Sequence, residues 1–315
     1  MLLRADADIA RPVTRLSSEY VLRALQLTIE AFGDVRAGLL AQAINIANTA
    51  RFNTRAEAWG RRAMGSERFL PNELRRPITV SALAASTGLP PETTRRVVQR
   101  LIQSGVCVRV EGGVIFPTET DRRPVITRAV TANVGYVRRF VRDLQGAGFV
   151  TDIPPWLRQT EDAVSDTFRA RVLARLSAEY LLRALRLMIE TYGNLCDGIL
   201  AHTIVTANMA HLDRRAGAGR FYAGVDQAPP DEVRRPISIA RLAESLELPF
   251  ETTRRHVLRL MDAGICVRVE GGLIVPQSVL ERPEVARSAL ANVGNVRKFV
   301  RDALAVSSDT HHCGA

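Results

Sequence analysis

The sequence is poor in lysine, aromatic residues and cysteine, and it has no long apolar run. Lys298 is the single lysine, so almost all of the positive charge is arginine. Without ~20 consecutive apolar residues, a membrane-spanning helix is not expected. Residues 1–15 carry charges of both signs and lack the apolar core of a secretory signal. Together with the absence of a cysteine framework, this predicts a cytoplasmic protein, and one associated with the nucleoid if it binds DNA.

The chemistry-bearing residues do not form an enzyme motif. The four cysteines, Cys107, Cys196, Cys266 and Cys313, lack metal-ligand spacing, and we expect Cys107 and Cys266 to be buried structural thiols. No phosphate-binding loop, dinucleotide-binding glycine motif or serine elbow is present. An enzyme is therefore the least favoured class, and no cofactor or metal is expected.

The charge is strongly basic, with a formal net charge of +10 at pH 7. Residues 1–157 hold 22 arginines and 14 acidic residues, whereas residues 158–315 hold 21 basic and 19 acidic residues. A GC-rich coding bias explains arginine in place of lysine, but it does not explain the excess of base over acid. The balance favours a polyanionic partner.

The chain is an internal duplication. Residues 16–25 recur as residues 176–185, and residues 75–117 recur as residues 234–276 with 27 of 43 positions identical. The period of about 160 residues is too long for a solenoid and suits a domain. With a stretch rich in glycine and proline near residue 150, the repeat predicts two domains, 1–150 and 151–315.

Each copy shows the same predicted order of helices. Apolar spacing predicts a first helix at 17–31 and 177–191, begun by Ser17 or Ser18 in the first copy and ended by Gly33 and Gly193. The other predicted elements are a second helix behind Asp34 and Asn194, to about Thr49 and Met209, a polar segment at 51–76, and a last amphipathic helix at 125–145 and 284–304.

Residues 78–110 predict two short helices joined by a turn. Thr79 suits the N-cap of the first helix, and residues 87–90, which include Gly88, suit the turn. Pro91 suits the first position of the second helix, since its missing N–H would have no helical partner there. Gly105 ends that helix. The alternating residues 106–110, the glycines Gly112 and Gly113, and residues 114–116 then predict a hairpin.

The order helix, turn, helix, hairpin is that of a winged helix. The motif resembles the winged helix-turn-helix of bacterial regulators of the IclR, MarR and GntR kind, with the IclR type closest in the turn. The resemblance covers about 40 residues of each half and is carried by Leu83, Ala84, Gly88, Leu89, Pro90, Thr93, Arg96, Leu101 and Gly105. The resemblance implies DNA binding through the second helix.

The candidate DNA contacts are therefore arginines and threonines on that helix. Arginine can grip guanine with two hydrogen bonds, and threonine can reach a phosphate or a thymine methyl. The candidates are Thr93, Arg95, Arg96 and Arg100 in the first copy, Thr252, Arg254, Arg255 and Arg259 in the second, and Arg109 and Arg268 in the hairpins, where core packing is the alternative role. For the pairs Arg75–Arg76 and Arg234–Arg235, phosphate contact and a plain solvated pair both stay open.

The second copy departs from the first at two motif positions. Glu247 stands where the first copy has the turn residue Gly88, and His256 stands where Val97 helps to line the core. We therefore expect a strong DNA-reading unit and a diverged partner, rather than two interchangeable units.

Other function classes remain open from the sequence. The second helix of each copy carries Asn45, Asn48, His202 and Asn208, which could line a pocket for a small-molecule effector. A winged helix can also serve as a protein-docking scaffold. A steep salt dependence of duplex binding would distinguish DNA binding from docking.

The expected fold is mainly α with short β-hairpin wings: two tandem winged-helix domains with additional long helices and approximate twofold symmetry. The expected function is double-stranded DNA binding by a transcription regulator. As a single-chain pseudo-dimer, it would read an imperfect palindrome with two recognition helices. A homodimer formed through the same long helices also stays open.

Overall fold

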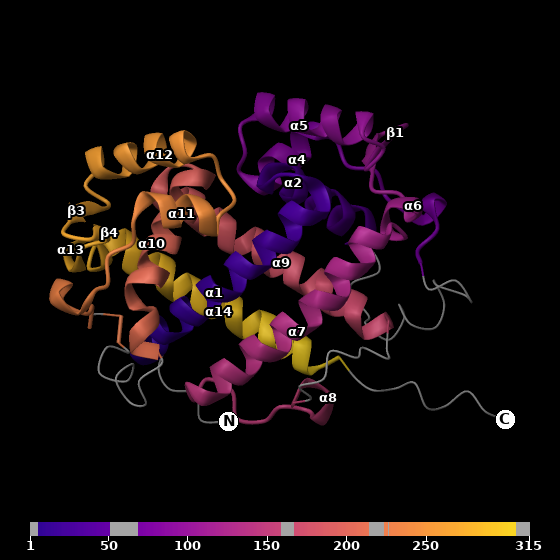
Figure 1. Cartoon of the computed structure of the whole chain (residues 1–315). Coiled ribbons are helices and arrows are strands. Elements are labelled where there is room, and N and C mark those ends of the chain that lie inside the picture. The colour runs from indigo at the N-terminus through magenta and orange to yellow at the C-terminus, as the bar shows by residue number, and fades with distance from the viewer. Residues whose placement is uncertain (1–5, 51–68, 159–166, 214–223, 226, 307–315) are drawn as a thin grey trace. The chain divides into compact units, whose positions relative to one another are not determined.

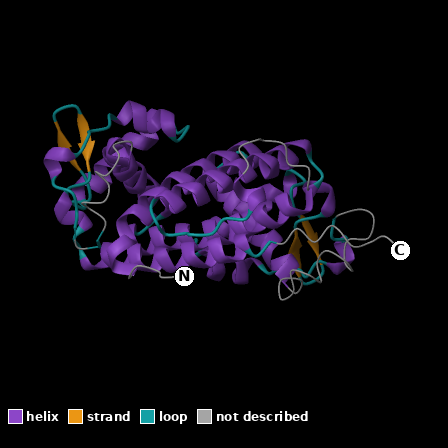
Figure 2. Ribbon diagram, turned by 90° about the horizontal axis from the view of Figure 1, so that it is seen from below, coloured by secondary structure: helices purple, strands orange, loops and turns teal. Residues whose placement is uncertain are grey.

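The computed structural model describes residues 6–50, 69–158, 167–213, 224–225 and 227–306. These residues form thirteen α-helices and two antiparallel hairpins of two strands each, so the predicted mainly helical fold with short hairpins is confirmed at that level. Figure 2 draws the hairpins as short orange ribbons beside the purple helices. Most of the predicted polar segment 51–76, namely residues 51–68, lies outside the described residues, as does Cys313.

The chain forms two compact units, and each draws on both halves of the sequence. The N-repeat unit comprises residues 23–139, 153–182 and 299–315, and the C-repeat unit comprises residues 1–22, 140–152 and 183–298. Each unit holds one copy of the repeated residues 75–117 or 234–276 together with part of a long helix from the other copy. The predicted domains 1–150 and 151–315 follow the duplication in sequence, which is a different division.

Four long helices contribute to both units, and the first and third of them begin at least ten residues earlier than predicted. They are α1 (Asp6–Phe32), α7 (Pro124–Gly146), α9 (Thr167–Tyr192) and α14 (Pro283–Leu304). The predicted start of α1 at Ser17 or Ser18 was wrong, because both serines are buried inside the helix and Ser17 donates to the Thr14 carbonyl. Pro12 lies in the helix near its start, where its missing N–H removes only one helical hydrogen bond.

In each unit, a hydrogen bond joins a long helix of one copy to a long helix of the other copy. In the N-repeat unit, Asn133 of α7 donates to the Ser177 hydroxyl of α9 at 2.8 Å. In the C-repeat unit, Asn292 of α14 donates to the Ser17 hydroxyl of α1, also at 2.8 Å. Since these residues are counterparts in the two copies, the same buried contact is formed twice, each time between residues of different copies.

The second helix of each copy begins where the sequence predicts. The helix α2 (Val35–Thr49) is capped by Asp34, which accepts a hydrogen bond from the Ala37 amide at 2.9 Å. The helix α10 (Leu195–Asp213) is capped by Asn194, which accepts from the Asp197 amide at 3.0 Å. The glycines before them, Gly33 and Gly193, have φ of +89° and +84°, so they end the preceding helices in the left-handed conformation.

In the N-repeat unit, two short helices and a hairpin follow one another (Figure 1). Thr79 caps the first helix, Gly88 ends it with a φ of +72°, and Pro91 opens the second, all as predicted. The elements are η3 (Asn72–Leu74), α4 (Val80–Thr87), α5 (Pro91–Gln103), β1 (Val108–Val110) and β2 (Gly113–Ile115), followed by α6 (Thr118–Asp121), α7 and α8 (Pro155–Arg158).

The C-repeat unit repeats this order with one difference in the turn. Glu247 takes the place of Gly88 with a φ of +52°, and among the described residues it is the one non-glycine residue with positive φ. The elements are η5 (Asp231–Val233), α11 (Ile239–Ser245), α12 (Phe250–Asp262), β3 (Val267–Val269), β4 (Gly272–Ile274) and α13 (Gln277–Leu280), followed by α14.

The hairpin is joined closely to the strand-like residue before the first short helix. Ile78 forms a β-bridge with Val114, and Ile237 forms one with Leu273. A Cβ on Gly113 would lie 2.3 Å from the Ile78 carbonyl oxygen, so this approach requires glycine. The buried residues of α5, among them Val97 and Leu101, complete a core on which α2 and α4 pack.

Candidate nucleic-acid interface

The helix α5 has one buried face and one basic, exposed face. Thr94, Val97, Val98 and Leu101 are buried, whereas Arg95, Arg96 and Arg100 are exposed. A helix divided in this way is held firmly from behind and presents its charges to solvent. The predicted contact Thr93 is half-buried at the edge of this face, as is its counterpart Thr252 on α12.

Arg95 is paired within its own helix. Its guanidinium donates to both oxygens of Glu92, at 2.7 and 2.9 Å, and both side chains are exposed. This hydrogen bond lowers the pKa of Glu92 and raises the pKa of Arg95. Because the pair is fully exposed and easily exchanged, Arg95 can leave Glu92 for a stronger partner.

Arg96 is exposed and forms no hydrogen bond or ion pair with any residue that the structure describes. Its charge acts on Glu92 only at a distance, adding a small lowering of the pKa of that carboxyl. Arg255, at the same position of α12, is also exposed and unpaired among the described residues. These two guanidinium groups keep all of their donors for an outside acceptor.

Arg100 and Arg259 lie about one helical turn further on, and each contacts a carboxylate at the start of the second helix of its unit. Arg100 lies 3.3 Å from Asp34, the N-cap residue of α2. Arg259 lies 3.1 Å from Asp197, in the first turn of α10. Both arginine side chains remain more than half exposed, at 56% and 53%. Both can therefore be reached from solvent.

The remaining predicted contacts are exposed as well. Arg254 pairs with Glu251 at 2.9 Å, repeating the Arg95–Glu92 pair. Arg109 on β1 and Arg268 on β3 are exposed and pair in register with Val114 and Leu273. Since their strand partners carry buried apolar side chains, each hairpin packs through one strand and exposes its arginine on the other.

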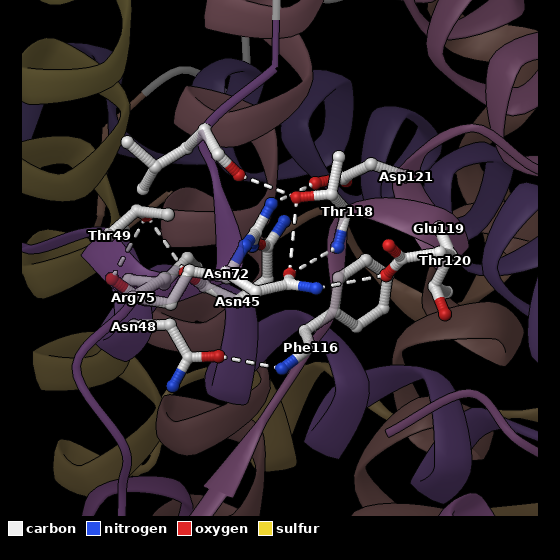
Figure 3. Close-up of polar contacts among 12 residues, drawn as sticks. Asn45, Asn48, Thr49, Asn72, Arg75, Phe116, Thr118, Glu119, Thr120 and Asp121 are labelled. Atoms are coloured by element: carbon white, nitrogen blue, oxygen red, sulfur yellow. Dashed lines mark hydrogen bonds and ion pairs between the residues drawn. The ribbon is translucent and has the colours of Figure 1, made fainter. Parts of the chain in front are cut away.

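Arg75 and Arg234 do not belong to this surface. Both are only 5% exposed, so the two readings left open by the sequence, phosphate contact and a solvated pair, were wrong for these two residues. Arg75 donates to Asn45 at 3.0 Å and to Asp121 at 2.5 Å (Figure 3). Arg76 and Arg235, the second members of the pairs, are exposed.

A buried asparagine connects α2 to the hairpin. The Asn48 amide donates to the carbonyls of Arg76 and Val114, at 2.7 and 3.2 Å. Its oxygen accepts from the Phe116 amide at 2.7 Å (Figure 3). Asn208 forms the equivalent three bonds in the C-repeat unit. The sequence named both asparagines as candidates for an effector pocket, but their polar atoms are occupied by backbone.

The other two candidates for the pocket are occupied too. Asn45 accepts from Arg75, and the His202 ring lies 3.0 Å from the Ser18 hydroxyl. Burial lowers the pKa of His202 to about 4, so this ring is neutral near pH 7. These side chains therefore serve packing between helices, and their polar atoms give no support to a ligand site.

The thiols of Cys107 and Cys266 are buried, as predicted. Burial raises the pKa of Cys107 to about 12 and that of Cys266 to about 11. Both therefore remain protonated and unreactive at neutral pH. Among the described residues, no group of three or more His, Cys, Asp or Glu side chains is placed to hold a metal ion, and no helix is long and apolar enough to cross a membrane.

One polar cluster was missed from the sequence. Asp197, His256 and Arg259 meet where α12 packs on α10, with the His256 Nδ1 atom 2.6 Å from an Asp197 oxygen. The replacement of Val97 by His256 was a visible signal. The other half of the cluster, Asp197, replaces Ala37 in a helix far away in sequence, and pairing the two required the fold.

Comparison of the chain with protein-family models, with curated proteins and with solved structures gave no match. The function must therefore be inferred from the chain's own residues.

Proposed function

We propose that the chain is a transcription regulator that binds double-stranded DNA, with α5 and α12 as the recognition helices of two winged helix-turn-helix motifs. The exposed, unpaired guanidinium of Arg96 carries the proposal. It lies in the N-terminal half of a helix whose other face is buried, which is the half that contacts base edges in this class of motif. The order α4, α5, β1, β2 and its repetition as α11, α12, β3, β4 support the same reading.

The exposed side chains divide into base-reading and phosphate-binding groups. Arg96 and Arg255 are free to donate two hydrogen bonds to a guanine. Arg95 and Arg254 would exchange Glu92 and Glu251 for a base, and a released glutamate can accept from a cytosine amino group. Arg100, Arg259, Arg109 and Arg268 serve phosphates, which fix the register of the helix without reading sequence.

Two recognition helices in one chain would read two half-sites. The helices share their three arginines, but Gln99 of α5 is replaced by Leu258 on α12. Glutamine can bond adenine with two hydrogen bonds, whereas leucine can only contact a thymine methyl or pack. The proposed target is therefore an imperfect palindrome, with the better defined half under α5.

The decisive experiment is selection of duplexes from a random pool by the full chain, followed by footprinting with the double variant Arg95→Ala, Arg96→Ala. We expect protection to weaken over one half-site only. The control is Arg186→Ala, which removes an exposed arginine from an i,i+4 pair with Glu190 on α9 and should leave the footprint unchanged.

Three results would contradict the proposal. If no duplex is enriched and binding is absent at low salt, the chain is not a DNA-binding protein. If the double variant weakens both half-sites equally, the two-helix reading is wrong. If Arg186→Ala weakens binding as much as the double variant, the effect comes from net charge rather than from α5.

A second candidate function is protein docking by α12. Phe250 and Leu258 of α12 are 48% and 41% exposed, and their counterparts on α5 are Pro91 and Gln99. Exposed aromatic and aliphatic side chains favour a protein partner over a phosphate backbone. If Phe250→Ser with Leu258→Gln leaves DNA affinity unchanged while Arg255→Ala also has no effect, docking is the better assignment for α12.

A further inference from the structure

Three side chains of the C-repeat unit form a polar triangle between α10 and α12. The Asp197 Oδ1 atom lies 2.6 Å from His256 Nδ1 and 3.1 Å from Arg259 Nη2, and Nη2 lies 2.5 Å from Nδ1. Asp197 and His256 are buried, whereas the Arg259 side chain is 53% exposed. Arg259, which reaches solvent, is thus bonded to two buried side chains, Asp197 and His256.

All three contacts cannot be satisfied in one protonation state. If His256 Nδ1 carries a lone pair, it accepts from Arg259 but faces the negative Asp197 oxygen. If Nδ1 carries a hydrogen, it donates to Asp197 but faces the Arg259 donor. The second oxygen of Asp197 is already bonded by Asn194 at 2.5 Å, so Oδ1 is the one acceptor that His256 and Arg259 share.

The charged groups around this triangle are few. Besides Asp197, the first turn of α10 (residues 195–198) holds no charged side chain, and its cap Asn194 is uncharged. The other helix packed on α12 is α11, whose charged residues, Arg241 and Glu244, are exposed. On α12 itself, Arg254 pairs with Glu251, and Arg255 and Asp262 are exposed. In the described part of the chain, the charged side chains bonded to His256 are those of Asp197 and Arg259.

We propose that Asp197 and His256 are positioning residues that control whether Arg259 is available to a DNA phosphate, with the proton on His256 as the control. With neutral His256, Arg259 is held against Asp197 and the imidazole. When His256 gains a proton, the imidazolium takes the Asp197 oxygen and repels the guanidinium. Arg259 then moves to solvent, and α12 gains a phosphate contact. The proposal rests on the proposed function of α12 in DNA binding.

The N-repeat unit provides an internal comparison, because it lacks a histidine at the position of His256. Arg100 contacts Asp34 at 3.3 Å, and the positions of His256 and Asp197 are occupied by Val97 and Ala37. Valine and alanine cannot titrate. Phosphate contact by Arg259 should therefore respond to pH, and that by Arg100 should not.

The test uses the full chain, a mixed-sequence 24-base-pair duplex and fluorescence anisotropy at several salt concentrations, at pH 8 and at pH 5.5. One added phosphate contact steepens the log–log salt slope by about 0.9. We expect the slope to be steeper by about this amount at pH 5.5. The difference should vanish in His256→Val. In the nearly isosteric variant Asp197→Asn, we expect the steep slope at both pH values. In Arg259→Ala, we expect the shallow slope at both pH values.

The control is Arg100→Ala, which should lower the slope equally at both pH values and leave the pH difference in place. His202 does not interfere, because its pKa of about 4 lies below the range. If the wild-type chain binds the duplex with one slope at both pH values, the control by His256 is wrong while the proposed function stands.

If the chain binds no duplex at all, the proposed function fails, and the triangle is tested on the free protein. The side-chain nitrogen resonance of Arg259, assigned by its loss in Arg259→Lys, should then shift between pH 8 and pH 5.5 in the wild-type chain and stay in place in His256→Val. An Arg259 resonance that behaves in the same way in both chains would overturn the role of His256 itself.

Discussion

The two second helices of the paired motifs, α5 and α12, keep the same arginines but differ in what lies between them. On α5 the exposed face includes Gln99 and Gln103, whereas α12 has Leu258 and Asp262 at these positions. Leu258 and Phe250 expose apolar surface that α5 lacks. The buried face, which packs against the core, has changed less than the exposed face.

Two arginines keep their positions in both copies but pair with carboxylates from different positions. Arg100 pairs with Asp34, the cap residue of α2. Arg259 instead pairs with Asp197, which lies three residues after the cap of α10. In the buried network, Arg75 pairs with Asp121 of α6, whereas Arg234 pairs with Asp231 of η5. The position of each arginine follows from the fold, and its carboxylate can come from any neighbouring element within reach.

The largest expected effect tests the different positions of the carboxylates that pair with the buried arginines Arg75 and Arg234. Asp121→Leu places the residue of the C-repeat, Leu280, into the N-repeat and leaves Arg75 buried without its carboxylate. We expect a loss of about 3 kcal/mol in the free energy of unfolding, because breaking a buried ion pair strands a charge. Urea unfolding followed by circular dichroism measures it.

The matching rescue is Asn72→Asp in the same variant, since Asn72 is the counterpart of Asp231. The double variant should recover part of the loss, because Arg75 regains a carboxylate while Arg171, whose charge also acts on Asp121, does not. Burial raises the pKa of Asp121 against the opposing effect of Arg75, so the N-repeat arrangement carries a desolvation cost. A double variant no more stable than Asp121→Leu would show that the carboxylate positions are not interchangeable.

The next effect compares the two unpaired arginines in DNA binding. Arg96→Ala should weaken binding to the selected duplex by about 1–3 kcal/mol, the value of one bidentate contact to guanine. Arg255→Ala should cost less, because apolar neighbours on α12 limit its approach to the groove. Titrations at one fixed salt concentration measure both, and equal losses would contradict the idea of one strong and one diverged helix.

The local elements could be predicted because their signals lie within a few residues. Thr79, Gly88 and Pro91 mark the turn region by backbone chemistry alone, and the structure forms these elements where the sequence predicts. The start of α1 could not be predicted in this way. Ser17 has the chemistry of a cap, but its hydroxyl is needed by Asn292, a residue 275 positions away.

Pairings across the chain were beyond the sequence for the same reason. The exposure of Arg95 and Arg96 follows from helical spacing, whereas the burial of Arg75 depends on Asn45 and Asp121, which only the fold brings to it. Nothing in a pair of adjacent arginines distinguishes a buried member from an exposed one. The Asp197–His256 contact is hidden similarly, since its two halves lie 59 residues apart.

A smaller effect tests the turn in which Glu247 replaces glycine. Glu247 has a φ of +52°, a conformation that costs a non-glycine residue about 1–2 kcal/mol. We expect Glu247→Gly to raise the free energy of unfolding by about 1 kcal/mol, and Gly88→Glu to lower it by a similar amount. A Cβ on Gly88 would meet no atom within 4 Å, so the reciprocal change isolates backbone conformation from steric overlap. Changes of the same sign in both variants, measured by thermal unfolding, would contradict this account.

The smallest effect concerns the hairpins. Arg109 and Arg268 are exposed on β1 and β3, and under the proposed function each contacts one phosphate rather than a base. Removing either arginine should reduce the log–log salt slope of duplex binding by about 0.9 and weaken binding by a similar factor for every sequence. Arg186→Ala, on α9, is the control for lost charge. Because each arginine stands between two valines on its own strand, equal changes are expected. A loss confined to Arg109→Ala would mean that the hairpin, like the helix beside it, has diverged in the second copy.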